Sequence, residues 1–227
     1  MRALIFYGDT ERSPAMRHEL PVTIGDPFLL GLVDGRLHVM ASGLERARIE
    51  AAAPDAVLHD YDELGFRELL ESGMSRHELE LELASRAAAA MGIRAATADP
   101  DMPVAVADRL RADGVLLDLD DAAISARRRV KSATELAGTR RAQIAAEAAM
   151  RAAAALLQRS DRDGDKLKLD GDVLTAEAVR AAVREVCQAQ GAPAPPDIIV
   201  SSPWSGYGHD PGSGPLPAGA AVDLLRL

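Results

Sequence analysis

Residues 197–219 read DIIVSSPWSGYGHDPGSGPLPAG. The stretch opens with a β-branched segment, Asp197–Val200, which we expect to form a strand. A loop rich in glycine and proline follows, and it carries one histidine, His209. A turn then leads into a second apolar segment, Ala220–Leu225, which holds one carboxylate, Asp223. Because a loop held between two strands can position reactive side chains well, the sequence predicts that a functional site begins here.

Two helices are expected to precede this stretch. Ser132–Glu135 has the spacing of a capping box and opens a long alanine-rich helix that we expect to reach about Gln158. Thr175 is expected to cap a second helix that ends near Gln190, and a proline-rich break at Gly191–Pro196 then leads into the strand. The predicted inner face of the long helix comprises Ile144, Ala148, Ala152, Ala155 and Leu156.

The earlier part of the chain indicates a mixed α/β arrangement with at least one antiparallel hairpin. Phe28–Val33 and Arg36–Ala41 flank Asp34-Gly35, a strong signal for a two-residue turn. Ser75–Glu78 is a capping box, and an apolar stripe of one helix follows it. The stripe comprises Leu79, Leu83, Ala87 and Met91. Further strands are expected at Ala3–Tyr7, Ala56–His59 and Val115–Asp118, and further helices at Leu44–Ala53, Val104–Ala112 and Asp121–Arg128.

A run of four cations in five residues, Arg127–Lys131, suggests a boundary between domains. We place the first domain at residues 1–128 and the second at residues 129–227. The run could bind a phosphate, but a solvated linker or a salt-bridge cluster at a domain interface is the interpretation that we favour.

Composition limits the function classes. The chain has 227 residues, of which 48% are hydrophobic, and a formal net charge of −9. Residues 1–130 hold 15 basic and 23 acidic residues, so this part would repel nucleic acid and anionic membranes. We therefore expect no nucleic-acid partner and no membrane partner. No apolar run approaches the roughly 20 residues that span a bilayer, which favours a cytoplasmic protein.

Other candidate sites are weaker. Asp161, Asp163 and Asp165 have the spacing of a calcium loop, but Lys166 stands where that loop needs glycine, so a polar surface turn is favoured. The single cysteine, Cys187, is expected to be a small buried hydrophobe. The histidines outside the loop show no metal-ligand spacing; they are His18, His38, His59 and His77.

Two passages resemble the pita-bread metallopeptidases, the family of Xaa-Pro aminopeptidases, prolidases, creatinases and methionine aminopeptidases. Residues 128–143, RRVKSATELAGTRRAQ, look like the start of the first helix of the catalytic domain. Residues 208–219, GHDPGSGPLPAG, look like the histidine loop of that domain. The resemblance implies a creatinase-like N-terminal domain followed by an incomplete, truncated pita-bread catalytic domain, with a mixed α/β (α+β) fold.

The resemblance also implies a chemistry. The family's hydrolases use two divalent metal ions (Mn, Co or Zn) held by two aspartates, one histidine and two glutamates. His209 corresponds to a catalytic histidine that contacts the substrate and is not a core metal ligand. The pattern places the first aspartate at Leu225, whereas Asp223 lies two residues earlier, on the same face of a strand. The other four ligands would fall beyond Leu227. We therefore expect this chain to bind no metal and no other cofactor.

Two functions remain in view. The first is an Xaa-Pro aminopeptidase-like protein whose full-length relatives act on peptide substrates, with this chain itself inactive. The second is a truncated or degenerate protein that is not an enzyme and serves as a binding or dimerisation module. Strand edges without their neighbours favour self-association, so a homo-oligomer is possible under either hypothesis.

Overall fold

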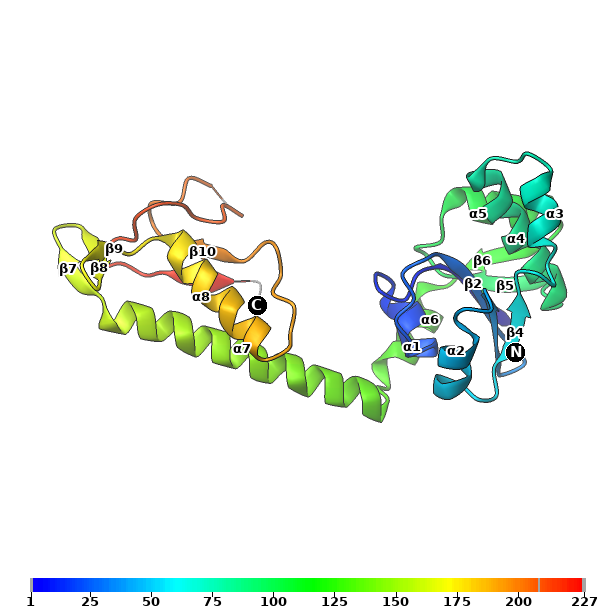
Figure 1. The fold of residues 1–227 in the computed structure, drawn as a ribbon, viewed down its shortest axis with the longest axis horizontal. Helices are drawn as coiled ribbons and strands as arrows, with labels where there is room; N and C mark the ends of the chain where they lie inside the picture. Colours follow the sequence, from blue (N-terminus) through cyan, green and yellow to red (C-terminus); the bar gives the residue numbers. More distant parts are fainter. Residues whose placement is uncertain (1, 208, 226–227) are drawn as a thin grey trace. The chain divides into compact units, whose positions relative to one another are not determined.

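The chain consists of two compact units, Met1–Thr134 and Glu135–Leu227, called the first and the second unit below (Figure 1). The computed structural model describes residues 2–207 and 209–225. The units meet six residues beyond the boundary that we placed after residue 128.

The first unit is built on a six-stranded sheet with the order β4-β3-β2-β1-β5-β6 (Figure 1). Strand β2 is antiparallel to β1 and β3, whereas the pairs β3–β4, β1–β5 and β5–β6 are parallel. The carboxyl ends of all strands except β2 therefore lie at the same edge of this sheet. The strands are β1 Ala3–Gly8, β2 Phe28–Val33, β3 Arg36–Ala41, β4 Val57–Asp60, β5 Ala95–Ala98 and β6 Leu116–Leu119.

Local sequence explains the centre of this sheet. Residues 3–6 of β1 are buried in succession, as expected of a strand that is covered on both faces. The turn between β2 and β3 has φ of +48° at Asp34 and +80° at Gly35, the left-handed backbone of a tight hairpin turn. The predicted hairpin is confirmed with the same bounds for both strands.

Helix α4 is positioned by its N-terminal cap. The Ser75 side chain accepts from the backbone N–H of Glu78, and the Glu78 side chain accepts from that of Ser75, so the predicted capping box is confirmed. The predicted apolar stripe is buried. Helices α1 and α3 and strand β5 were not predicted. The helices of the first unit are α1 Pro14–Glu19, α2 Arg46–Ala52, α3 Phe66–Glu71, α4 Arg76–Ala90, α5 Val104–Ala112 and α6 Asp121–Arg129.

The cationic run has a structural role within the first unit. The Nε atom of Arg127 lies 2.5 Å from Oε1 of Glu19, and a second nitrogen donates to Oε2 at 2.8 Å. Glu19 ends α1 and its side chain is only 8% exposed, so the pair ties α6 to α1. The ion pair agrees with a salt-bridge role for the cationic run. It joins two helices of the first unit, however, and does not lie at an interface between domains.

Two histidines that seemed unrelated in the sequence meet on the parallel strands β3 and β4. Nδ1 of His38 lies 3.0 Å from Nε2 of His59, and the two rings stack with centroids 5.3 Å apart. One ring nitrogen must donate to the other, so the contact needs at least one imidazole to be neutral. The contact does not conflict with the lack of metal-ligand spacing among these histidines. It depends on the pairing of β3 with β4, which a separation of 21 residues does not reveal.

We expect the first unit to lose stability as the pH falls from 7.5 to 5.5. Burial lowers the pKa of both imidazoles; the charges of His59 and Arg36 lower that of His38 further, and Glu63 partly opposes the shift at His59. The unfolded chain therefore takes up protons near the ordinary histidine pKa of about 6.5, before the native state does. Stability is present above that pH and is lost as the pH falls through the native pKa values.

Urea unfolding followed by far-ultraviolet circular dichroism at both pH values measures this loss. His59→Gln should flatten the pH dependence, and the exposed His77→Gln serves as the matched control. Equal pH dependence in the two variants would contradict a role for the histidine pair.

The second unit packs two helices against short strands. Helix α7, Ala133–Arg159, is followed by a three-stranded antiparallel sheet, by α8, Ala176–Ala189, and by the strand pair β10–β11. The core of this unit includes Ala149, Ala153, Val183 and Ile198, all of which are buried. The strands are β7 Asp161–Asp163, β8 Lys166–Leu169, β9 Asp172–Val173, β10 Ile199–Ser201 and β11 Asp223–Leu225.

Two predictions for the second unit were wrong in detail. The buried residues of α7 are Ala145, Ala149 and Ala153, whereas the predicted Ile144 is 58% exposed and Ala155 is also exposed. In an alanine-rich helix, small apolar residues lie on several faces, so the sequence pattern identifies the buried face only weakly. The predicted face is therefore rotated about the helix axis relative to the buried one. The segment expected to be a polar surface turn does hold an exposed turn at Gly164-Asp165, but Asp161–Asp163 before it forms β7, which pairs with β8. An ion pair of 2.7 Å joins Asp163 to Lys168.

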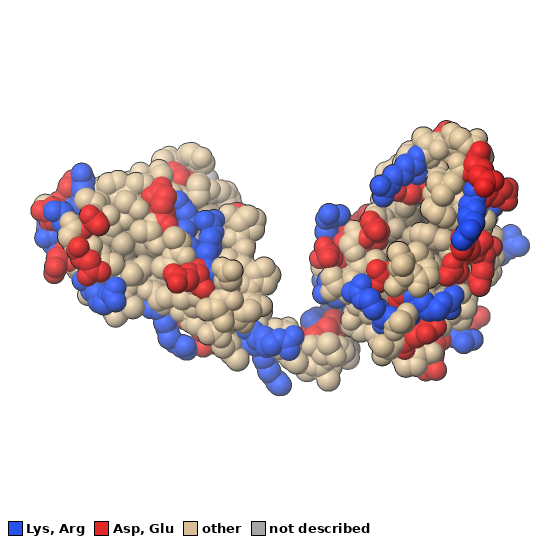
Figure 2. Space-filling model, in the orientation of Figure 1, with Lys and Arg blue, Asp and Glu red and all other residues tan. Residues whose placement is uncertain are grey.

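Charged side chains of both signs are interspersed over the visible face of each unit (Figure 2). Among the residues that the structure describes, no helix is long and apolar enough to cross a membrane.

Candidate functional site: the His209 loop

The candidate site is the loop that joins β10 to β11. The two strands are antiparallel, and the register pairs Ile199 with Leu225 and Ser201 with Asp223. Residues two apart on a strand share a face, so Asp223 lies on the same face as Leu225, as predicted. Both side chains are exposed.

The returning part of the loop runs very close to β10. The backbone N–H of Val200 donates to the carbonyl oxygen of Pro211 at 3.0 Å. Gly212 has φ +74°, and a Cβ placed there would lie 1.8 Å from the carbonyl oxygen of Val200. Only glycine fits such an approach, so the Pro-Gly-Ser-Gly motif has a steric purpose.

Helix α8 holds the same part of the loop from the other side. Arg180, whose side chain is 12% exposed, donates to the carbonyl oxygens of Pro211 and Gly212, the latter at 2.8 Å. Both carboxylate oxygens of Glu177 accept from the backbone N–H of Gly214 at 3.1 Å. The guanidinium of Arg180 also lies 3.5 Å from Glu177. These contacts fix the loop backbone with charged groups, which make stronger hydrogen bonds than neutral ones.

Asp210 organises the tip of the loop. Its two carboxylate oxygens accept from the backbone N–H groups of Gly206 and Gly212, each at 2.8 Å. These two hydrogen bonds hold the pKa of Asp210 below its ordinary value, so it stays ionised at neutral pH. His209 adjoins this anchor with φ +66° and an exposed side chain. Gly208, which belongs to the same motif, lies outside the described residues.

The tip carries one imidazole and two exposed aromatic side chains. Trp204 is 48% exposed and Tyr207 is 73% exposed. An exposed imidazole can donate to a carbonyl oxygen of a ligand, and aromatic rings can cover an apolar group. The loop can therefore contact an extended peptide or a similar amide.

The residues present do not fit a centre of two metal ions. Within residues 2–207 and 209–225, no three His, Cys, Asp or Glu side chains converge on a point where they could hold a metal ion. Asp223 stands on β11 opposite Ser201, and the Asp161–Asp165 segment forms a hairpin stabilised by Lys168. Neither carboxylate group is part of a ligand set.

Sequence reasoning missed Glu177 and Arg180. They lie 37 and 32 residues before their partners Gly214 and Gly212, so their spacing gives no sign of the contact. The only available signal was their position in the first turns of the helix that Thr175 caps. It was therefore predictable that some residues would anchor the loop, but not which residues they would be.

Comparison with solved structures finds peptidases with a similar fold. The prolidase from Pyrococcus horikoshii OT3 superposes with a TM-score of 0.62 over 99% of this chain, at 13% identity. The dipeptidase PepE from Mycobacterium ulcerans gives 0.61 over 99% at 20% identity, and the X-Pro aminopeptidase from Thermotoga maritima MSB8 gives 0.52 over 89% at 12% identity. No protein-family profile and no curated protein matches the sequence.

The chain has the fold of prolidase-like peptidases. The mixed α/β fold and the resemblance to the pita-bread proteins are thus confirmed at the level of the fold. The chain covers 56% of the P. horikoshii prolidase, 55% of PepE and 49% of the aminopeptidase. It therefore spans about half the length of these prolidase-like structures.

His209→Ala should change the free energy of unfolding by less than about 0.5 kcal/mol, as is usual for an exposed position. Histidine and alanine both carry a Cβ, so most of the steric cost of the left-handed backbone is present in both proteins. Urea unfolding monitored by Trp204 fluorescence tests this expectation. A loss of several kcal/mol would show that the imidazole supports the fold.

Proposed function

We propose that the chain is an Xaa-Pro peptidase-like protein and that the His209 loop is the part of it that contacts a peptide. The observation that carries the proposal is the loop itself, a Gly/Pro segment with one histidine, held between two strands on a prolidase-like fold. The anchors on α8 and the Asp210 carboxylate support a contact role, because a preorganised loop binds without first having to be ordered.

In this proposal the His209 imidazole donates a hydrogen bond to a carbonyl oxygen of the peptide. Such a donor also favours an oxyanion that develops at that oxygen. The exposed rings of Trp204 and Tyr207 offer apolar surface for a neighbouring side chain or for the pyrrolidine ring of a proline. His209 then contacts the substrate, which is the role that the resemblance to the pita-bread proteins implies.

Hydrolysis in these peptidases depends, according to the same resemblance, on two divalent metal ions. The described residues of this chain supply no converging ligand set for them. We therefore propose that the 227-residue chain by itself does not hydrolyse Xaa-Pro dipeptides, and we assign no hydrolytic step to its residues.

The purified chain should show no turnover of Ala-Pro or Leu-Pro above the metal-only blank when Mn²⁺, Co²⁺ or Zn²⁺ is supplied. The P. horikoshii prolidase in the same assay provides the positive control. Turnover that is abolished by a chelator would refute the proposed inactivity. Absence of turnover is also expected of a binding module that is not an enzyme. A comparison of dipeptide binding by the wild-type chain and by His209→Ala then tests whether the loop contacts the dipeptide.

A further inference from the structure

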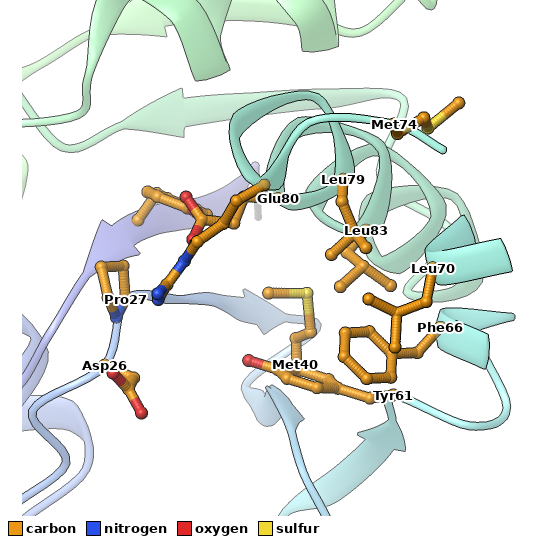
Figure 3. Close-up of a pocket in the computed structure, with 12 residues that line it drawn as sticks. Asp26, Pro27, Met40, Tyr61, Phe66, Leu70, Met74, Leu79, Glu80 and Leu83 are labelled. Carbon is orange, nitrogen blue, oxygen red and sulfur yellow. The ribbon is translucent and has the colours of Figure 1, made fainter. Parts of the chain in front are cut away.

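The first unit contains a pocket of about 390 Å³, a size typical of sites for small ligands. It lies where the carboxyl ends of β1, β3 and β4 meet helices α3 and α4 (Figure 3). In open α/β sheets, ligands bind outside the carboxyl ends of the strands. The pocket is separate from the His209 loop, which belongs to the second unit, so this inference goes beyond the proposed function.

One side of the pocket is apolar. Figure 3 shows Phe66 and Leu70 of α3 facing Leu79 and Leu83 of α4, with Met40 of β3 between them and the opposite wall. Leu79, Leu83 and Met40 are buried, whereas Leu70 is 56% exposed. These residues can enclose an apolar group while Leu70 leaves an open rim.

Aromatic rings line the floor of the same pocket. The Tyr61 ring lies against Phe66 with centroids 5.7 Å apart, and Tyr7 lines the wall formed by β1. Burial, followed by the charge of Glu80, raises the pKa of Tyr7 to about 12, and burial with Asp26 and Glu80 raises the pKa of Tyr61. Both phenols therefore keep their protons at neutral pH and stand in a negative field.

The opposite side of the pocket carries that negative charge. Figure 3 shows Asp26 and Glu80 across from the apolar side chains. Glu80 accepts from Nε of Arg76 at 2.8 Å, so these two charges offset each other. Asp26 is exposed and makes no ion pair with any of the described residues within 4 Å. The charged groups that line the pocket thus leave one net negative charge.

We propose that this pocket binds a small organic cation, namely a primary amine attached to an aromatic or branched apolar group. The apolar group would lie against Leu79, Leu83 and Phe66. The ammonium would lie near Asp26 and over the face of an aromatic ring, where a cation is attracted by the ring quadrupole. An anion of similar size meets the same apolar wall but is repelled by Asp26, because Arg76 offsets the charge of Glu80.

Three probes that share a benzyl group and are similar in size separate charge from apolar contact: 2-phenylethylamine, 2-phenylethanol and phenylacetate. Titration of the full chain, followed by nuclear magnetic resonance of the backbone amides, gives a Kd for each probe. We expect the amine to bind most tightly, the alcohol more weakly and the acid not measurably. Comparison of free leucinamide with a peptide that has an amino-terminal leucine distinguishes a small amine from a peptide terminus as the source of the cation.

Two variants locate the site. Asp26→Asn should weaken amine binding about two- to fivefold, which is the range for an exposed ion pair, and should leave binding of the alcohol unchanged. Asp34→Asn is the control and should change neither. Leu70→Trp should fill the rim and weaken amine and alcohol together at least tenfold, whereas Val104→Trp, at another exposed apolar position, should not. Equal binding of the three probes, no binding at all, or amine binding that neither variant changes would overturn the proposal.

Discussion

Replacing Gly212 with alanine should lower the free energy of unfolding of the second unit by about 3 kcal/mol, the combined order of a left-handed alanine and an overpacked contact. The added Cβ would lie 1.8 Å from the carbonyl oxygen of Val200, and backbone cannot move aside as a flexible side chain can. Relief requires the loop to leave β10, which breaks the hydrogen bond from Val200 to Pro211.

Gly214→Ala is the matched control. Gly214 also has a left-handed backbone, with φ +68°, but a Cβ there would meet nothing within 4 Å. This variant should lose only the backbone preference, about 1 kcal/mol. Trp204 is the only tryptophan, so its fluorescence during urea unfolding reports on this loop. Equal losses in the two variants would show that Gly212 does not pack against β10.

Arg180→Ala should cost the second unit about 2 kcal/mol, the range for hydrogen bonds that involve a charged group. The side chain is 12% exposed, and its removal leaves the carbonyl oxygens of Pro211 and Gly212 without this donor. The effect should be accompanied by faster proteolysis between residues 202 and 214, because the loop loses one of its two anchors on α8.

Arg184→Ala tests the same helix one turn further along. Arg184 is exposed and donates to the carbonyl oxygen of Pro196 at 3.2 Å, so its loss should cost less than about 1 kcal/mol. Arg180→Lys, which keeps the charge but not the forked donors, should fall between wild type and Arg180→Ala. If Arg180→Ala and Arg184→Ala unfold at the same urea concentration, α8 does not anchor the loop.

The elements that were predicted correctly have a local sequence signal. That signal is enough to identify the element without any contact to distant residues. The β2–β3 hairpin follows from Asp34-Gly35, and α4 begins where Ser75 caps it. Helix α5, at Val104–Ala112, has the predicted bounds. In the hairpin and in α4, a turn or a cap fixes the backbone, whereas α5 follows Pro103 and has no side-chain cap.

The elements that sequence missed depend on partners far along the chain. Strand β5, Ala95–Ala98, has little β propensity of its own and is stabilised between β1 and β6. Strand β8 gains part of its pairing from the His209 loop, because Leu167 donates to the carbonyl oxygen of Leu216 at 3.0 Å. Its sequence, Lys-Leu-Lys-Leu, does alternate with the period of a strand, a local signal that we did not use.

The same distinction applies to the sites. His209 and its glycines were visible because they form one continuous motif, whereas Glu177 and Arg180 reach the loop only through the packing of α8. The pocket of the first unit was not visible at all, since its walls come from β1, β3, α3, α4 and three connecting segments. Sequence indicated where the loop lies, and the structure was needed to show what holds it.

We propose that this prolidase-like fold holds no centre for two metal ions within its described residues. Calorimetric titration of the purified chain with Mn²⁺ at neutral pH tests this proposal most directly, with Asp223→Asn as the comparison. We expect no saturable binding of two ions per chain and identical traces for the two proteins. Binding of two ions per chain, weakened by Asp223→Asn, would contradict the proposal.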